Sequence, residues 1–394
     1  MTLYFLVFFA AVIAELVKGL SANGTPPVLQ KFDWQLDLAH RMWTHIKTVR
    51  VVLGFALIVL FFAMTGDQQV RAVPGSILLG MLWAGIYWVF NHYWVGRVKF
   101  QPLGQRVFAN AADNTVDPAL PVIGVSVNGA TKAYPTSMLF YHHQVPDEIG
   151  GQPVWATYCG LCRSGRIYDR TVDGQPLDFE LVGAITFNAV FTDRQTGSWW
   201  RQETGEAVKG PRSGHVLSDI PFEQMSLAHW LEKHPDSEIL QYDPDFRKQY
   251  MMRDRMMNYE ASLPRWHMQE RPALVIGVEV DGAARAYDWD EMKKRRVVSD
   301  QLGDTPVLVV SAADESLAAV YDRRVDGQTL DFTWSDDVLS DTGTGSRWTA
   351  LGRCVEGPLA GTQLTALQSY QQYVRAWIAF HEGTDFYDFN QARS

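Results

Sequence analysis

Hydrophobic residues form three long stretches within the first hundred residues of the chain. Ala72 to Gly96 contains no Asp, Glu, Lys or Arg, and it is long enough to cross about 30 Å of hydrocarbon. Val51 to Gly66 is also uncharged but short, so Arg50 would have to extend its charged end to the membrane surface. Leu3 to Leu16 lacks the basic start of a signal peptide. We therefore predict two or three transmembrane helices in residues 1–100, near 3–20, 50–66 and 73–96.

Beyond residue 100 the pattern changes to that of short strands joined by tight turns. Val-x-Val segments lie beside Asn128-Gly129 and Asp281-Gly282, which is a strong signal for β-hairpins. We predict a second hairpin that turns at Asp173-Gly174, between residues 166–168 and 177–179. Apolar residues three and four apart predict helices over Ser226 to His234 and Tyr370 to Phe380. The Pro-containing, aromatic stretch from Gln241 to Trp266 is interpreted as a linker.

This strand pattern occurs twice in the chain. Val122-Ile123-Gly124-Val125 recurs as Val275-Ile276-Gly277-Val278, and Tyr168-Asp169-Arg170 recurs as Tyr321-Asp322-Arg323. Further along, Trp230 and His234 match Trp377 and His381. The matches keep their order, and each repeat has the size of a domain, so we interpret them as a tandem duplication. The sequence thus predicts a strand-rich α+β fold, with a first copy over residues 101–245 and a second over 246–394.

The composition of the chain excludes only a few classes of function. Apolar residues make up 47% of the chain and charged residues 20%, which suits packed domains rather than disorder. The net charge of −9 and the lack of a basic run argue against a nucleic-acid partner. Three cysteines cannot form a disulfide framework. The partners that remain are the membrane and an unknown redox partner or small molecule.

One Cys-x-x-Cys motif, Cys159 and Cys162, is present in the first copy only. In the second copy the paired positions are Ala312 and Glu315, and Arg295-Arg296 stands where the first copy has His142-His143. This joint loss is expected of a site that the second copy no longer uses. Two cysteines at this spacing can form a small disulfide ring or bind one metal ion. Because Ser164-Gly165 and another strand follow the motif, we reject a thioredoxin fold, in which a helix begins there.

Two chemical interpretations of the motif stay open. In a thiol oxidoreductase, Cys159 is the attacking thiol, Cys162 resolves the intermediate, His142 carries protons and Arg163 favours the thiolate. In a metal-binding module, the ligands come from Cys159, Cys162, His142 and His143, and the metal is copper or zinc. Polar residues that could line a pocket beside the thiols are Asp193, Arg194 and Trp200. A surface ion pair on a hairpin is the alternative interpretation of the Asp–Arg pair.

The motif also carries a family resemblance. Thr157-Tyr158-Cys159-x-x-Cys162, followed by Tyr168-Asp169-Arg170, resembles the family known as domain of unknown function 3179. The resemblance is strong over about Val122 to Leu240 and weak in the second copy. It departs from the family at Gly160, where Pro is usual, and at His143 and Pro146. Selenocysteine in place of a motif cysteine, described for some members, implies redox chemistry rather than structural zinc.

The sequence therefore predicts a membrane-anchored thiol redox protein, with a metal module and a non-enzymatic membrane scaffold as alternatives. It does not decide whether the chain is an enzyme. The predicted location is the bacterial inner membrane, crossed several times. Lys and Arg are more frequent before the second predicted span and after the third than in the turn between these two spans. Because positively charged loops tend to stay in the cytoplasm, this pattern predicts that the soluble part is cytoplasmic. The family resemblance implies the opposite, exported side.

Overall fold

The computed structural model describes residues 1–23, 34–261, 274–312 and 316–390. By the density of internal contacts, the chain divides into two compact units. One unit contains residues 1–101, 177–202 and 206–215, and the other contains 102–176, 203–205 and 216–394. Three residues that our predictions use lie outside the described residues. They are Lys31, which precedes the second predicted span, Glu315, which is paired with Cys162, and Trp266, the end of the predicted linker.

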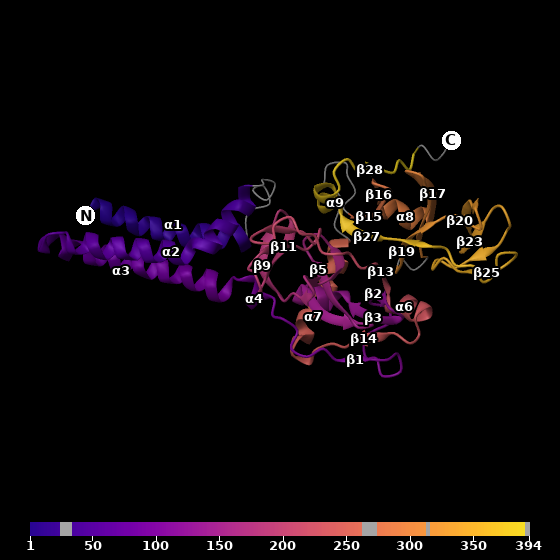
Figure 1. Ribbon diagram of the computed structural model, residues 1–394, viewed down its shortest axis with the longest axis horizontal. Coiled ribbons are helices and arrows are strands. Elements are labelled where there is room, and N and C mark those ends of the chain that lie inside the picture. Colours follow the sequence, from indigo (N-terminus) through magenta and orange to yellow (C-terminus); the bar gives the residue numbers. More distant parts are fainter. Residues whose placement is uncertain (24–33, 262–273, 313–315, 391–394) are drawn as a thin grey trace. The chain divides into compact units, whose positions relative to one another are not determined.

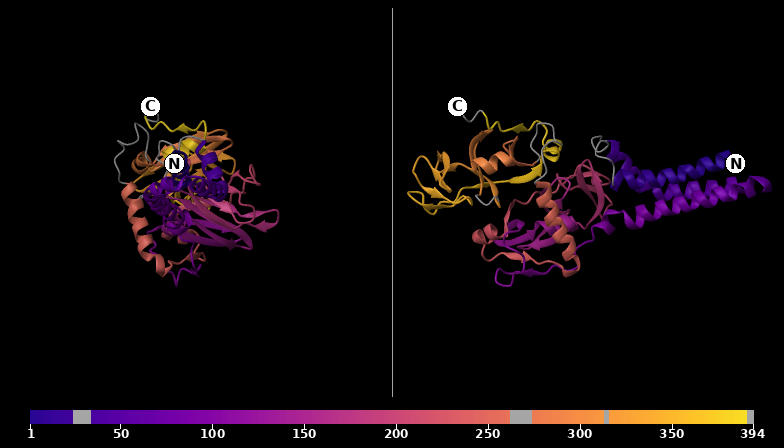
Figure 2. Two further views of the ribbon diagram at one scale, coloured as in Figure 1. Left: turned by 90° about the vertical axis from the view of Figure 1, so that its left-hand side faces the viewer. Right: turned by 180° about the vertical axis from the view of Figure 1, so that it is seen from behind.

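Three long apolar helices form most of the first unit and run side by side (Figure 1). They are α1 (Thr2–Asn23), α2 (Trp34–Phe62) and α3 (Gly66–Trp88), which continues into a π-helical turn, η1 (Val89–Tyr93). The short helix α4 (Gly96–Lys99) follows. Three segments are long and apolar enough to span a membrane, namely Thr2–Ala22, Trp34–Phe62 and Gly66–Tyr93. The prediction of transmembrane helices is confirmed to that extent, and Figure 2 shows the same helices from behind.

The second helix differs from the predicted span. It begins at Trp34, well before the expected start near residue 50, so Arg50 lies in its middle. Arg50 Nε and Nη2 donate to the two carboxylate oxygens of Glu15 on α1, at 2.5 and 2.9 Å. The sequence pattern did not show this partner on a neighbouring helix, and the expectation that Arg50 extends to the membrane surface stays a prediction.

A four-stranded antiparallel sheet completes the first unit. Its order is β12-β11-β10-β9, with β9 (Phe179–Ile185), β10 (Asn188–Asp193), β11 (Trp199–Arg201) and β12 (Ala207–Lys209). Val182, Ile185, Val190 and Trp199 of this sheet share a core with Ala22 of α1 and Ala39 of α2. Lys209 forms an ion pair with Asp37 at 2.6 Å. A sheet that we had assigned to the first copy therefore packs against the ends of two apolar helices.

The first half of the second unit holds a five-stranded sheet and a three-stranded sheet. The order of the larger sheet is β1-β14-β3-β2-β13, with β1 (Phe108–Ala109), β2 (Pro121–Val127), β3 (Ala130–Pro135), β13 (Phe222–Ser226) and β14 (Glu238–Leu240). The smaller sheet is β4 (Gln144–Ile149), β5 (Gln152–Cys159) and β6 (Ser164–Asp169). The helices are α5 (Thr136–His142), α6 (Leu227–Lys233), the 3-10 turn η2 (Pro244–Phe246) and α7 (Arg247–Ala261).

The second half has elements in a corresponding order. A four-stranded sheet, β27-β15-β16-β28, contains β15 (Leu274–Val280), β16 (Ala283–Asp288), β27 (Ser369–Tyr373) and β28 (Asp385–Phe386). A second sheet joins β17 (Val297–Leu302), β18 (Thr305–Ser311), β19 (Ala318–Asp322) and β26 (Ala366–Leu367). A third joins β22 (Phe332–Ser335), β23 (Val338–Asp341), β24 (Arg347–Trp348) and β25 (Cys354–Glu356). The helices are α8 (Trp289–Arg295) and α9 (Val374–Phe380).

Equivalent residues of the two halves occupy equivalent strand positions. Ile123 pairs with Tyr134 across β2 and β3, and Ile276 pairs with Tyr287 across β15 and β16. Gly124 and Gly277 each lie against a buried tryptophan, and an added Cβ would come within 2.2 Å of its ring in both places. These are Trp230 on α6 and Trp377 on α9. Such a recurrence is what a tandem duplication predicts, and the duplication stays our interpretation of the sequence.

The local predictions have mixed outcomes. The hairpin at Asn128-Gly129 is confirmed, since both residues have positive φ and β2 pairs with β3. The turn at Asp173-Gly174 joins only the short strands β7 (Thr171–Val172) and β8 (Gln175–Pro176), because β6 pairs with β5 and β9 pairs with β10. β20 (Arg324–Val325) and β21 (Gln328–Thr329) form its counterpart.

Two of the predicted helical or linker segments differ in extent. Helix α6 is confirmed, whereas α9 begins only at Val374 because the residues before it form strand β27. The predicted linker is largely the helix α7, which contacts α5 and so belongs to the fold of the first half.

Candidate functional site

The Cys-x-x-Cys motif forms the tight turn between β5 and β6. Cys159 ends β5 and pairs with Ser164, the first residue of β6, and the Cys162 N–H donates to the Cys159 carbonyl at 3.2 Å. Arg163 adopts the left-handed conformation at φ 55°, which brings the chain back into register. A strand follows the motif, so the rejection of a thioredoxin fold is confirmed. Cys159, Cys162 and Cys354 are all buried thiols.

Helix α5 covers the turn. Phe140 lies so close to Gly160 that a Cβ at that position would come within 1.9 Å of the aromatic ring. The same ring lies 5.9 Å from that of Tyr158. This contact explains why Gly160 stands where proline is usual in the family that the motif resembles, since a larger residue would have to displace Phe140. Leu161, at the tip of the turn, is 43% exposed.

The two histidines have partners on other segments. His142 Nε2 lies 2.7 Å from the hydroxyl of Tyr250 on α7, and its ring packs edge-on against Phe246. His143 has a positive φ, and its carbonyl accepts from the N–H of Tyr158, next to the motif. Within the described residues, no group of three or more His, Cys, Asp or Glu side chains could hold a metal ion. The expected ligand set of Cys159, Cys162, His142 and His143 therefore gains no support from the geometry.

A chain of polar contacts leads away from the turn. Ser164 donates through its hydroxyl to Glu203 at 2.5 Å, and Arg166 donates to the other carboxylate oxygen of Glu203 at 3.1 Å. Glu203 is fully buried, so this ion pair is shielded from water. The guanidinium of Arg166 also lies over the ring of Tyr370, at 4.0 Å from its centroid. The chain connects the strand beside Cys159 to residues of the second half.

Burial and charge set the protonation of these groups. Burial lowers the pKa of Arg166, but the negative charge of Glu203, together with the smaller contributions of Tyr370, Tyr168 and Asp219, outweighs it, and the pKa is raised. Burial raises the pKa of Tyr370 and of Asp219, although the charge of Arg166 acts in the opposite direction on both. Burial, and next the charge of Arg166, lowers the pKa of His381. At neutral pH the site therefore holds a permanent cation beside a neutral histidine and a neutral tyrosine.

The polar chain ends in a cavity of ≈ 500 Å³ formed by both halves of the second unit. Its titratable lining residues are Arg166, Glu203, Asp219, Glu279, Asp281, Tyr370 and His381. His381 lies 3.0 Å from Glu279 through Nδ1 and stacks on Trp377. A small polar molecule could reach the Arg166–Glu203 pair from this side.

The two halves exchange contacts in a reciprocal way at this site. The N–H of Tyr373 in the second half donates to the carbonyl of Cys162 at 2.9 Å. Conversely, the N–H of Ser226 in the first half donates to the carbonyl of Ser316 at 2.9 Å. Such a two-way exchange is typical of an interface with approximate two-fold symmetry. The motif thus occupies one of two similar positions.

The described residues of the other position are mainly apolar. Arg296 follows α8 with a positive φ, as His143 follows α5, and its guanidinium donates to the carbonyl of Ala312 at 2.7 Å. Ala312, Leu317 and Leu351 share a hydrophobic core with Met225 and Trp230 of the first half. Leu317 occupies the strand position that is equivalent to that of Ser164. The second half therefore has an apolar side chain where the polar chain of the first half begins.

The supporting residues named from the sequence lie in two places. Arg163 belongs to the turn itself, and its buried Nη1 has no hydrogen-bond partner within the described residues. Asp193 accepts from the backbone and hydroxyl of Thr196 and from Trp200 Nε1, and it belongs to the first unit. Arg194 pairs with Glu180 at 2.6 Å on the surface.

The Asp193 arrangement recurs in the second half. Asp341 accepts from Thr344 and from Trp348 Nε1 in the same pattern. Because both halves keep this network, a structural role in holding the turn explains Asp193 and Trp200. The observed partner of Arg194 fits the alternative interpretation, a surface ion pair.

Glu203 and Tyr370 are not among the site residues predicted from the sequence, and His381 was named there only as the match of His234. A signal for Glu203 was available, because the second half has Ala350 and Leu351 in the corresponding stretch. The signal for Tyr370 was absent, since that residue meets Arg166 only through the packing of the two halves.

The sequence pattern of one protein family matches residues 102–384. The chain belongs to the family described as protein of unknown function, DUF3179. The match covers both halves, so the second half is part of the region that defines this DUF3179 protein. The resemblance, which we described as strong over about Val122 to Leu240 and weak in the second copy, lies within this matched region. No curated protein and no solved structure matches the chain.

Proposed function

We propose that this DUF3179 protein is a membrane-anchored thiol–disulfide redox protein that uses Cys159 and Cys162. The observation that supports this most directly is the turn between β5 and β6. In a tight turn the first and fourth Cα atoms lie within about 7 Å, and a disulfide needs about 4.4–6.8 Å. The Cys162 N–H to Cys159 carbonyl hydrogen bond identifies this turn. The backbone separation of the two cysteines is therefore compatible with a disulfide, although no cysteine pair within the described residues lies at disulfide distance and both are free thiols.

The reaction that follows is a two-electron exchange with a disulfide of a partner molecule. The Cys159 thiolate attacks one partner sulfur, so a Cys159–partner bond forms, the partner disulfide breaks and one partner thiolate leaves. The Cys162 thiolate then attacks Cys159 sulfur, which forms the Cys159–Cys162 disulfide and releases the second partner thiolate. Two protons leave the cysteines and two reach the partner. We assign to Arg163, which follows the motif directly, the role of the cation that favours the thiolates.

Access to the thiols requires the turn to open. Cys159 and Cys162 are buried, and Phe140 covers Gly160. The exposed side chain of Leu161 is the part of the turn that a partner meets first. The side of the membrane on which this takes place stays a prediction from the Lys and Arg pattern.

Thiol counting on the full-length chain in detergent tests the proposal. We expect glutathione disulfide to convert the chain to a form two mass units lighter, and dithiothreitol to reverse the change. The change should be lost in Cys159→Ser and in Cys162→Ser, because each removes one end of the bond. Cys354→Ser is the matched control, since Cys354 is also a buried thiol but lies in β25, and it should behave like the wild type.

Elemental analysis of the same samples separates the alternatives. Copper or zinc that is lost with either motif cysteine would overturn the redox proposal in favour of a metal module. Metal-free protein whose two motif thiols never form a disulfide would leave the scaffold interpretation.

A further inference from the structure

The apolar helices of the first unit contain a group of polar side chains that anchoring does not require. Glu15 of α1 is 1% exposed and lies eight residues before the end of that helix, which is about 12 Å along its axis. It forms the bidentate ion pair with Arg50 of α2, and Arg50 Nη2 also donates to Asn91 at 3.2 Å. Ionisable groups within membrane spans are costly and usually have a function. The pair is electrically neutral as a whole, which reduces that cost.

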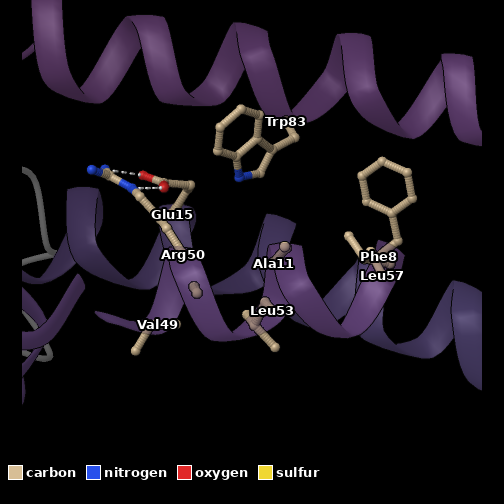
Figure 3. A pocket seen from close by; sticks show the side chains of 10 residues that line it. Phe8, Ala11, Glu15, Val49, Arg50, Leu53, Leu57 and Trp83 are labelled. Carbon is tan, nitrogen blue, oxygen red and sulfur yellow. Dashed lines mark hydrogen bonds and ion pairs between the residues drawn. The ribbon is translucent and has the colours of Figure 1, made fainter. Parts of the chain in front are cut away.

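A cavity of ≈ 220 Å³ adjoins this ion pair. Its walls come from all three helices and are mostly carbon, with Phe8, Ala11, Leu53, Gly54, Leu57 and Trp83 among the lining residues. Figure 3 shows Glu15 and Arg50 at one end, Phe8 and Leu57 at the other, and Trp83 between them. An apolar cavity with a few polar groups at one end is the usual form of a small-molecule site.

The polar groups that remain available at the cavity are donors. Both carboxylate oxygens of Glu15 already accept from Arg50. Within the described residues, Nη1 of Arg50 and Nε1 of Trp83 have no hydrogen-bond partner. A ligand that fits must therefore present acceptor oxygens. A further cation, Lys18, lies beside the pair, but it does not line the cavity and donates to Phe90 and Asn91. Of the two charged groups that line the cavity, Glu15 would repel a carboxylate, so the ligand should be uncharged.

The size and walls of the cavity favour a ring. A cavity of about 150 Å³ holds benzene, so ≈ 220 Å³ suffices for one substituted six-membered ring. The aromatic side chains of Phe8 and Trp83 provide faces and edges for such a ring. We propose that this cavity binds the ring of a quinone or a closely related lipophilic compound, whose carbonyl oxygens accept from Arg50 and Trp83. The proposal concerns binding alone and does not depend on the chemistry of Cys159.

Photolabelling of the full-length chain in phosphatidylcholine nanodiscs tests the proposal. The probe is an azido-benzoquinone with a decyl tail, and unlabelled decyl-benzoquinone is the competitor. We expect competed labelling on the helix segments around Ala11 and Gly54, located by mass spectrometry. Gly54→Phe should reduce it at least tenfold, because a Cβ at Gly54 meets no atom within 4 Å and the new ring would fill the cavity. Trp83→Phe keeps a ring but removes a donor, and a severalfold loss is expected.

Gly85→Phe is the matched control. A Cβ at Gly85 also meets no atom within 4 Å, but the residue does not line the cavity, so labelling should stay within twofold of the wild type. Equal labelling of the Gly54 and Gly85 variants would overturn the proposal. Palmitate that competes as well as the quinone would overturn it too, because the cavity would then hold an acyl chain.

Discussion

The two halves of the second unit share an arrangement of strands but differ at one turn. In the first half, Ser164 begins β6 and connects through Glu203 to Arg166. In the second half, Leu317 takes the place of Ser164 and packs into a hydrophobic core. A buried ion pair is rarely more stabilising than the apolar side chains that could replace it. Stability alone therefore does not explain the polar version, and the proposed redox function assigns its chemistry to the first half.

The comparison also separates shared support from local function. Asp193 of the first unit and Asp341 of the second half make the same contacts, and so do the tryptophans that cover Gly124 and Gly277. Features present twice hold the fold. Features present once, such as the motif cysteines and Glu203, are the ones that a functional test should address first.

The largest effect is expected for Glu203→Ala. This change leaves the buried Arg166 without its counter-charge and should destabilise the chain by about 3–5 kcal/mol. Urea unfolding of the full-length chain in detergent, followed by tryptophan fluorescence, measures it. Adding Ser164→Leu and Arg166→Ala, the residues of the second half, should restore part of the loss. A triple variant less stable than the single one would contradict the view that the apolar version is equally stable.

A smaller and equal effect is expected for Asp193 and Asp341, which make matching contacts. Asp193→Ala and Asp341→Ala each remove a buried acceptor from a Thr and a Trp Nε1, so each should cost about 1–3 kcal/mol. The same unfolding measurement applies, with thiol counting as the second readout. Loss of thiol reactivity in the Asp193 variant alone would show that this residue serves the motif and not only its own turn.

The smallest effect concerns pH. Burial and the charge of Arg166 lower the pKa of His381, while Glu203 and Glu279 act in the opposite direction. A histidine with a lowered folded-state pKa contributes stability that is present above about pH 6.5 and is lost as pH falls through the folded-state pKa. His381→Gln should therefore flatten the pH dependence of unfolding below about pH 6.5. His234→Gln, at the matching position of the first half, should do the same, because burial also lowers the pKa of His234. Unchanged pH profiles in both variants would refute this account.

The sequence by itself determined the local features of this protein. Long uncharged runs predict helices that can span a membrane, since hydrocarbon offers no partner to a free charge. Asn-Gly and Asp-Gly turns between alternating residues predict hairpins, since few other residues adopt positive φ. Cys159 and Cys162 are present in only one of the two repeats that we infer from the sequence, and this difference marks them as a candidate site. Each of these signals lies within a few residues along the chain.

Only the tertiary structure decided which distant groups meet. Glu15 neutralises Arg50 across two helices, Glu203 reaches Ser164 and Arg166 from the turn after β11, and Tyr370 belongs to the other half. The sheet of β9 to β12 joins the apolar helices rather than its own neighbours in sequence. These contacts depend on packing between segments that are far apart in the chain, and no local pattern encodes them.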